Sequence, residues 1–351
     1  MALLAQTIAA IQDLDEIARQ AARERQSQLT KPPGSLGRLE RLSIQIAGIQ
    51  GKARPDVSRK ALFVMAGDHG VVAEGVTAFP QDVTWQMVAN FVAGGAAINV
   101  LGRQVGAKVV VVDVGVVGDA PASAAVIVKK VGRGTKNMAV GPAMTREEAV
   151  RAVEVGIEVL AAEMDPPLDL VGVGDMGIGN TTPSAAIISA FTGRSPAEVT
   201  GRGTGIDDAR HAHKIGVIAR ALAVNQPDAA EALDVLAKVG GFEIGAIAGV
   251  MLAAAARRVP VVVDGVISSA GALVAAGLAP KVKDYLIAGH RSVEPGHRAA
   301  LEHLGLEPLL DLEMRLGEGT GGAIAMHVVE AAVRTLNEMA TFAEAGVAEA
   351  L

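Results

Sequence analysis

A chain of 351 residues without cysteine cannot form disulfides or zinc–thiolate sites. Its formal net charge of -6, with no basic run interleaved with aromatic residues, argues against a nucleic-acid partner and favours a small molecule. Hydrophobic residues make up 50% of the chain but aromatic ones only 2%, so the core must consist of aliphatic side chains, which favours layered helices and parallel strands.

The N-terminal segment is predicted to be helical as far as about Gly51. The opening stretch "MALLAQTIAAIQDLDEIARQ" has the pattern of an amphipathic helix and lacks the basic start of a signal peptide, so we expect a cytoplasmic location. Two prolines and two glycines in "TKPPGSLGRLE" predict a loop over Thr30 to Glu40. The longest apolar run, Ile244 to Ala256, is shorter than the ~20 residues that cross a bilayer, so no membrane partner is expected.

After these helices the pattern changes to short apolar runs that alternate with helix-like segments. The runs are rich in β-branched residues, which is typical of buried strands. They are centred near Leu62, Val110, Val171, Val262 and Ile287. We therefore predict an α/β fold with a Rossmann-like parallel sheet flanked by helices.

Polar residues follow these apolar runs. Because ligands bind at the carboxyl ends of parallel strands, we expect the polar ends to surround one crevice. The C-terminal stretch is helical and is expected to pack with the N-terminal helices, which divides the chain into a helical segment 1–55, an α/β core 56–320 and C-terminal helices 321–351. The polar ends are Asp68 with His69, Asp113, Asp175, Asp264 with Ser268, and His290 with Ser292.

The glycine-rich stretch "GVGDMGIGNTTPSAA" contains G-x-G-x-x-G at Gly172, Gly174 and Gly177, so it resembles a dinucleotide fingerprint. However, Thr181 or Thr182 suits the helix cap, which predicts a helix beginning about six residues beyond Gly177. A dinucleotide loop enters its helix almost directly and is followed by a second strand, and "SAFTGRSPAEVTGRG" shows no strand pattern. A mononucleotide site is the alternative.

Two further glycine loops lead into helices. In "GRGTGIDDARHAHK", Lys214 could reach back to a phosphate, although an exposed helix lysine is the interpretation that the bare sequence favours. In "LGEGTGG", Glu318 is either an acid stabilised by the helix dipole or a base held where a ligand can approach. The glycines themselves could simply serve tight turns and close packing.

No metal site is predicted at the histidines or at the two aspartates near the strand ends. His69, His290 and His297 lack metal-ligand spacing and are interpreted as hydrogen-bonded loop histidines. Asp113 and Asp264 are interpreted as structural residues that accept hydrogen bonds from loop N–H groups.

Taken together, the motifs resemble the nicotinate-nucleotide:dimethylbenzimidazole phosphoribosyltransferase family from about Lys31 to the final helix. This resemblance implies a Rossmann-like large domain, a small helical domain drawn from both chain ends, and a homodimer with active sites near the subunit interface. It implies phosphoribose transfer from nicotinate mononucleotide to a benzimidazole base, without metal or organic cofactor. The motifs that carry it, in the family's order, are "KPPGSLGRLE", "AGDHGVVAEGVTAFPQDVT", "GGAAINVL", "GVGDMGIGNTT", "GRGTGIDD", "GGFEIGAIAG", "DGVISSAGAL", "GHRSVEPGH" and "LGEGTGG".

The resemblance also implies roles for individual residues. Glu318 stands at the position of the family's catalytic glutamate and would take the proton of the attacking base. Ser292 matches a position beside the nicotinate leaving group, and Gly317 and Gly319 would leave room for flat rings. The phosphate and nucleotide would be held by Gly177, Gly203, Thr204, Gly205 and Lys214.

The chain departs from the family pattern at three positions. Asp175 replaces a glutamate, so we expect it to bind or orient the base. Phe79 and Met87 occupy positions that are polar in the family, which predicts a more apolar base pocket. Two other functions stay open, namely a nicotinamide-dependent dehydrogenase and a non-catalytic nucleotide-binding homologue, although the intact "LGEGTGG" argues against the latter.

Overall fold

The computed structural model describes residues 2–119, 125–203 and 205–348. Its centre is a six-stranded sheet in the order β3-β2-β1-β4-β5-β6, and every pair of neighbouring strands is parallel. All five predicted strands are present and the α/β prediction is confirmed; the sixth strand, β3, was not predicted. The strands are β1 (Lys60–Gly67), β2 (Ala107–Gly115), β3 (Val126–Val128), β4 (Leu170–Met176), β5 (Val261–Val263) and β6 (Leu286–Ala288).

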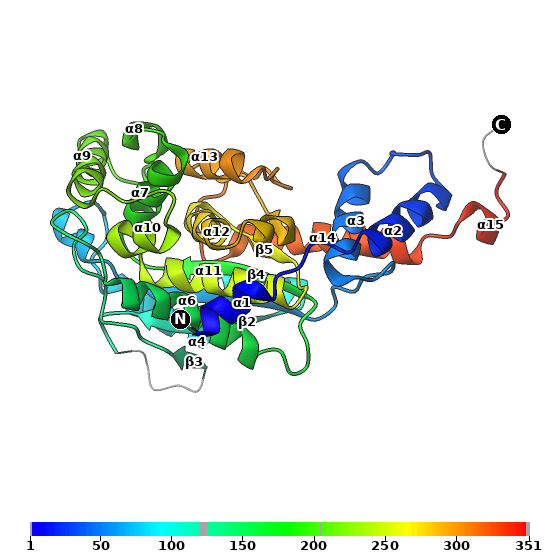
Figure 1. The fold of residues 1–351 in the computed structure, drawn as a ribbon, viewed down its shortest axis with the longest axis horizontal. Helices are drawn as coiled ribbons and strands as arrows, with labels where there is room; N and C mark the ends of the chain where they lie inside the picture. Colours follow the sequence, from blue (N-terminus) through cyan, green and yellow to red (C-terminus); the bar gives the residue numbers. More distant parts are fainter. Residues whose placement is uncertain (1, 120–124, 204, 349–351) are drawn as a thin grey trace.

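Helices cover both faces of the sheet (Figure 1). Consecutive side chains of β1 point to opposite faces, so Phe63 belongs to one hydrophobic cluster and Val64 to the other. Every residue of β1 is buried, as expected for a strand covered on both sides. One face carries α1 (Ala2–Ala9), α6 (Arg146–Ala162), α11 (Phe242–Ala256) and α12 (Val266–Leu278); the other carries α4 (Val83–Ala93), α5 (Ala97–Val105) and α14 (Thr320–Glu338).

Most of the remaining helices of this part of the chain follow β1, β4 and β6, whereas the 3-10 helix over Pro280–Tyr285 directly precedes β6 and so lies at the amino end of that strand. α7 begins at Thr181 after the N-cap Asn180, so the predicted start about six residues beyond Gly177 was wrong. The stretch 189–203 holds α8 and no strand, as predicted. These elements are η1 (Gly70–Glu74), α7 (Thr181–Thr192), α8 (Pro196–Val199), α9 (Asp208–Asn225), α10 (Ala232–Val239), η2 (Pro280–Tyr285) and α13 (Pro295–Leu304).

Segments from the two halves of the chain meet to one side of the sheet, where α2 (Glu16–Gln28), α3 (Arg38–Gln50), the end of α14 and α15 (Phe342–Ala345) lie together (Figure 1). The stretch Met1 to Gln20 was predicted as one amphipathic helix, and this was wrong. The chain breaks after α1, and Asp15 accepts a hydrogen bond from Ala18 N to start α2. α1 itself packs on α6 and α11, so the division at residue 55 stays a prediction.

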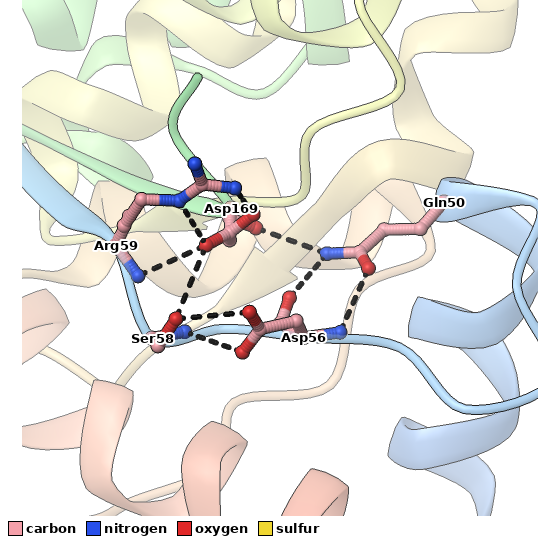
Figure 2. Close-up of polar contacts among 5 residues, drawn as sticks. All are labelled: Gln50, Asp56, Ser58, Arg59 and Asp169. Atoms are coloured by element: carbon pink, nitrogen blue, oxygen red, sulfur yellow. Dashed lines mark hydrogen bonds and ion pairs between the residues drawn. The ribbon is translucent and has the colours of Figure 1, made fainter. Parts of the chain in front are cut away.

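A polar cluster joins α3 to the starts of β1 and β4 at the amino edge of the sheet (Figure 2). Arg59 forms two parallel hydrogen bonds to the carboxylate of Asp169, each 2.9 Å long. Gln50, the last residue of α3, donates to the backbone oxygen of Asp169 at 3.2 Å. These contacts fix the relative position of β1 and β4, and the carboxyl end of β4 lines the candidate site.

None of the described helices combines the length and the apolar character that a bilayer crossing requires.

Close packing of α6 against α11 predicts a strong stability effect at Gly156. A Cβ there would lie 2.0 Å from the backbone oxygen of Ala246, so Gly156→Ala must push the helices apart. We expect the free energy of unfolding to fall by on the order of 3 kcal/mol in urea denaturation. Gly216→Ala is the matched control: it lies on α9 with open space around it, and we expect a gain of about 0.5–1 kcal/mol. Equal effects of the two substitutions would contradict this account.

Candidate active site

A cavity of about 520 Å³ lies at the carboxyl edge of the sheet. A smaller one of about 40 Å³ adjoins it, because Asn180, Thr181 and Gly203 line both. The prediction that the polar strand ends gather in one crevice is therefore confirmed for β4 and β6. Of the predicted site residues, Phe79, Asp175, Gly203, Ser292 and Gly317 line the larger cavity, and Gly177, Gly203 and Lys214 line the smaller.

The polar residues near the ends of β1 and β2, Asp68 and Asp113, do not line this cavity. Asp113 accepts a hydrogen bond from Val116 N at 2.9 Å and pairs with Lys130, which confirms its structural interpretation but not its place in the crevice. Asp68 likewise accepts from Val117 N at 2.8 Å. Both stabilise loops beyond β1 and β2 rather than lining the cavity.

Lys214 is buried, so its interpretation as an exposed helix lysine was wrong. Only 2% of the residue is exposed, and its Nζ donates a hydrogen bond to Thr181 Oγ1 at 2.6 Å. Burial lowers the pKa of Lys214 to about 8, an effect that the charge of Glu294 opposes. The ammonium group is thus mostly protonated at neutral pH and stands beside the glycine loop, 3.6 Å from where a Cβ of Gly203 would lie.

The glycine loop before α9 holds a carboxylate that sequence analysis missed. Gly203 N donates to Glu294 Oε1 at 2.9 Å, and a Cβ on Gly201 would lie 1.8 Å from Glu294 Oε2, so a side chain at Gly201 would have to displace the Glu294 carboxylate. Glu294 directly precedes Pro295 at the start of α13, a position that sequence alone assigns to a helix cap. Of the other loop residues, Thr204 lies outside the described part of the chain, and Gly205 lines neither cavity.

Asp175 ends β4 and lines the larger cavity. Its Oδ2 accepts a hydrogen bond from Asn180 Nδ2 at 2.8 Å. Burial, followed by the charge of Asp264, raises the pKa of Asp175 to about 8. At neutral pH its carboxyl group therefore carries a proton that it can donate to a ligand.

Glu318 lies in a turn between two glycines with positive φ and itself has a φ of +61°. Gly317 lines the cavity, whereas the Glu318 carboxylate lies behind it, and its Oε2 accepts a long hydrogen bond of 3.4 Å from Ile98 N. Burial raises the pKa of Glu318; the Ile98 N–H opposes this shift and the charge of Asp264 adds to it. Such a carboxyl group is a better proton acceptor than an exposed glutamate.

The backbone of the Gly317–Gly319 turn packs directly against the backbone of β4. A Cβ on Gly174 would lie 2.3 Å from the carbonyl carbon of Glu318, so the strand needs glycine here. Gly319 faces Gly174 and Ile98 and does not line the cavity, so open space for a flat ring exists beside Gly317 but not beside Gly319.

The two predicted apolar pocket residues differ in position. Phe79 lines the cavity and is 47% exposed. Met87, on α4, is half-buried and packs against the hydrophobic cluster that contains Phe91 and Ile98. It does not line the cavity.

Each histidine lies beside protein groups, but of the three only His297 shows the side-chain hydrogen bonds that were predicted. His69 lies 2.9 Å from Glu243; burial opposes its charge, but the Glu243 carboxylate outweighs this and raises the pKa of His69. His297 is held between Ser269 Oγ at 3.1 Å and the backbone oxygen of His290 at 2.9 Å, and burial lowers its pKa to about 4. His290 alone of the three lines the cavity.

A parallel α/β sheet whose carboxyl edge brings a glycine loop, a buried lysine and two buried carboxyl groups to two adjoining cavities is the architecture of a nucleotide-binding enzyme. The family described as Phosphoribosyltransferase matches residues 11–347, which places the chain among phosphoribosyltransferases. The chain belongs to the nicotinate-nucleotide:dimethylbenzimidazole phosphoribosyltransferase family, as its relatives show.

Two relatives and one solved structure illustrate this. The nicotinate-nucleotide--dimethylbenzimidazole phosphoribosyltransferase of Desulforudis audaxviator is 61% identical and covers 100% of this chain and 99% of its own. The protein of the same name from Chloroflexus aggregans is 59% identical over 99% of both chains. A crystal structure of CobT from Thermus thermophilus matches with a TM-score of 0.92 and 49% identity, covering 95% of this chain and 100% of that one.

Proposed function

We propose that this enzyme transfers phosphoribose from nicotinate mononucleotide to 5,6-dimethylbenzimidazole or a related base, giving α-ribazole 5′-phosphate and nicotinate. The observation that carries the proposal is a cavity lined by Gly203 and Thr181, next to the buried Lys214, and by Asp175 and Gly317, next to Glu318. The names of the relatives support the same pair of substrates.

The reaction follows from this arrangement of charges. The nucleotide phosphate binds the loop N–H groups and the Lys214 ammonium. One nitrogen of the base attacks C1′ of the ribose while the bond from C1′ to the pyridinium nitrogen breaks, and the electron pair of that bond stays with nicotinate beside Ser292. The other nitrogen of the base gives its proton to Glu318.

Direct displacement inverts C1′, which accounts for an α product without a covalent intermediate on the enzyme. The positively charged pyridinium is a good leaving group, so the protein needs no strong acid. Holding both substrates in one cavity supplies much of the rate through orientation. Phe79 would contact the base at the cavity wall, with Met87 on the helix behind. We further propose that the enzyme is a cytoplasmic homodimer.

The test is incubation of the purified protein with nicotinate mononucleotide and a panel of benzimidazoles and purines, with products identified by mass spectrometry. We expect nicotinate and an α-ribazole 5′-phosphate in equal amounts. Binding of nicotinate mononucleotide without release of nicotinate would indicate a non-catalytic homologue. An absorbance change from hydride transfer with a full dinucleotide would indicate a dehydrogenase.

Asp175→Asn should retain most activity at neutral pH. Because the carboxyl group of Asp175 is protonated below a pKa of about 8, asparagine has nearly the same shape and charge there. We expect kcat/KM for the base within about tenfold of wild type at pH 7. With nicotinate mononucleotide kept saturating, so that Lys214 does not limit binding, the wild type should lose activity above pH 8 as Asp175 becomes negatively charged beside Asp264, and the variant should lose less. An identical alkaline decline in both proteins would contradict the assignment.

A further inference from the structure

Asp264 is a buried carboxylate that follows β5 and faces the start of α14. Its Oδ2 accepts a hydrogen bond from Gly319 N at 3.1 Å, and its Oδ1 accepts one from Gly322 N at 3.0 Å. Only 1% of the residue is exposed, and the cavity is lined by the residues after it and not by Asp264 itself. Asp264 thus acts on the site through other residues.

The residue it acts through is Glu318. A φ of +61° is uncommon for a glutamate, and such conformations persist only when the surroundings hold them. Gly319 N belongs to the peptide bond that directly follows Glu318, so one oxygen of Asp264 holds that peptide while the other holds the first turn of α14. Gly174 closes the opposite side of the same peptide.

We propose that Asp264 is a positioning residue for Glu318: its carboxylate clamps the turn at Gly319 and Gly322 and so holds Glu318 where it can accept the proton of the attacking base. This inference rests on the proposed transfer reaction. The clamp contributes to kcat, because proton transfer needs Glu318 in a fixed position, and contributes little to binding of the nucleotide.

The negative charge of Asp264 also favours the role of Glu318 as a base. Two carboxyl groups neighbour Glu318, Asp175 at the end of β4 and Asp264 after β5, while α5 contributes the Ile98 N–H. His290, after β6, lies beyond Asp264, with its Nε2 3.4 Å from Asp264 Oδ1. The negative charge of Asp264 raises the pKa of Glu318 and thereby strengthens it as a base.

The test is steady-state kinetics of Asp264→Asn across pH. The amide nitrogen cannot accept a hydrogen bond, so one of the two clamp contacts is lost together with the charge. We expect kcat to fall about 10- to 100-fold, while KM for nicotinate mononucleotide stays within about threefold. The acid limb of the kcat–pH profile should move to lower pH, because Glu318 loses a negative neighbour. A purely structural role would not move this limb.

Three further variants distinguish an effect of Asp264 on Glu318 from a simple loss of stability. Asp113→Asn, at another buried aspartate that holds a loop N–H, should lower stability without moving the acid limb. In an Asp175→Asn background the shift from Asp264→Asn should persist, because it acts on Glu318. Asp264→Ser, which keeps one acceptor and removes the charge, serves as a second variant if Asp264→Asn does not fold.

Failure of this inference and failure of the proposed function give different results. A folded Asp264 variant with wild-type kcat and an unmoved acid limb overturns the inference, as does a shift that vanishes in the Asp175→Asn background. A wild-type protein that releases no nicotinate overturns the proposed function instead, and this is established before any variant is compared.

Discussion

Glu318→Gln should lose most phosphoribosyl transfer while still binding nicotinate mononucleotide. Glutamine has the shape of glutamate, so the Gly317–Gly319 turn and its contact with Asp264 should survive, but the amide cannot accept the proton of the base. General-base catalysis typically contributes 10²- to 10⁴-fold, and we expect kcat to fall by about 10³-fold. The measurement is nicotinate release, with nucleotide affinity determined separately by calorimetry.

The pH dependence of the wild type provides a second test of the same residue. Glu318 acts only when deprotonated, so activity should fall as pH decreases through its pKa, which burial raises above that of an ordinary glutamate. Glu338→Gln, at the last residue of α14, removes an exposed carboxylate paired with Arg334 and should leave kcat unchanged. If Glu318→Gln turns over at the wild-type rate, Glu318 has no part in the mechanism.

Lys214→Met should weaken nucleotide binding with a smaller effect on kcat. Methionine fills a similar buried volume without the charge, and hydrogen bonds to charged groups contribute about 1.5–3 kcal/mol. We therefore expect KM for nicotinate mononucleotide to rise about 10- to 100-fold. Wild-type affinity should also weaken above pH 8, because the pKa of Lys214 is about 8 and only the protonated amine attracts phosphate.

The control for this variant is Lys281→Met, which removes a half-exposed lysine paired with Asp13. It should leave the KM unchanged. A dissociation constant for nicotinate mononucleotide equal to that of the wild type in Lys214→Met would refute the phosphate assignment.

Local patterns were sufficient to predict the sheet. β1, β2 and β4 are long runs of buried aliphatic residues, and the polar residues after β4 and β6 line the cavity as predicted. Asp264 was correctly interpreted as an acceptor for loop N–H groups, because a carboxylate beside glycines at a strand end has few other partners.

Features that depend on tertiary contacts could not be predicted. The burial of Lys214 arises from the loop that folds over it and from Thr181, 33 residues away in sequence. The contact of Glu294 with Gly203 joins residues 91 positions apart. Similarly, the left-handed backbone of Glu318 is imposed by β4 and Asp264, and no local pattern marks a glutamate for this conformation.

The contact between Glu294 and the glycine loop has a thermodynamic consequence. Gly203 N donates a hydrogen bond to the Glu294 carboxylate, so this N–H has an anionic partner within the protein. A phosphate that takes the same donor must displace Glu294 and send its charge elsewhere. Under the proposed function, binding at the loop is an exchange of one anion for another, and the measured affinity is the difference between two similar interactions rather than the full strength of either.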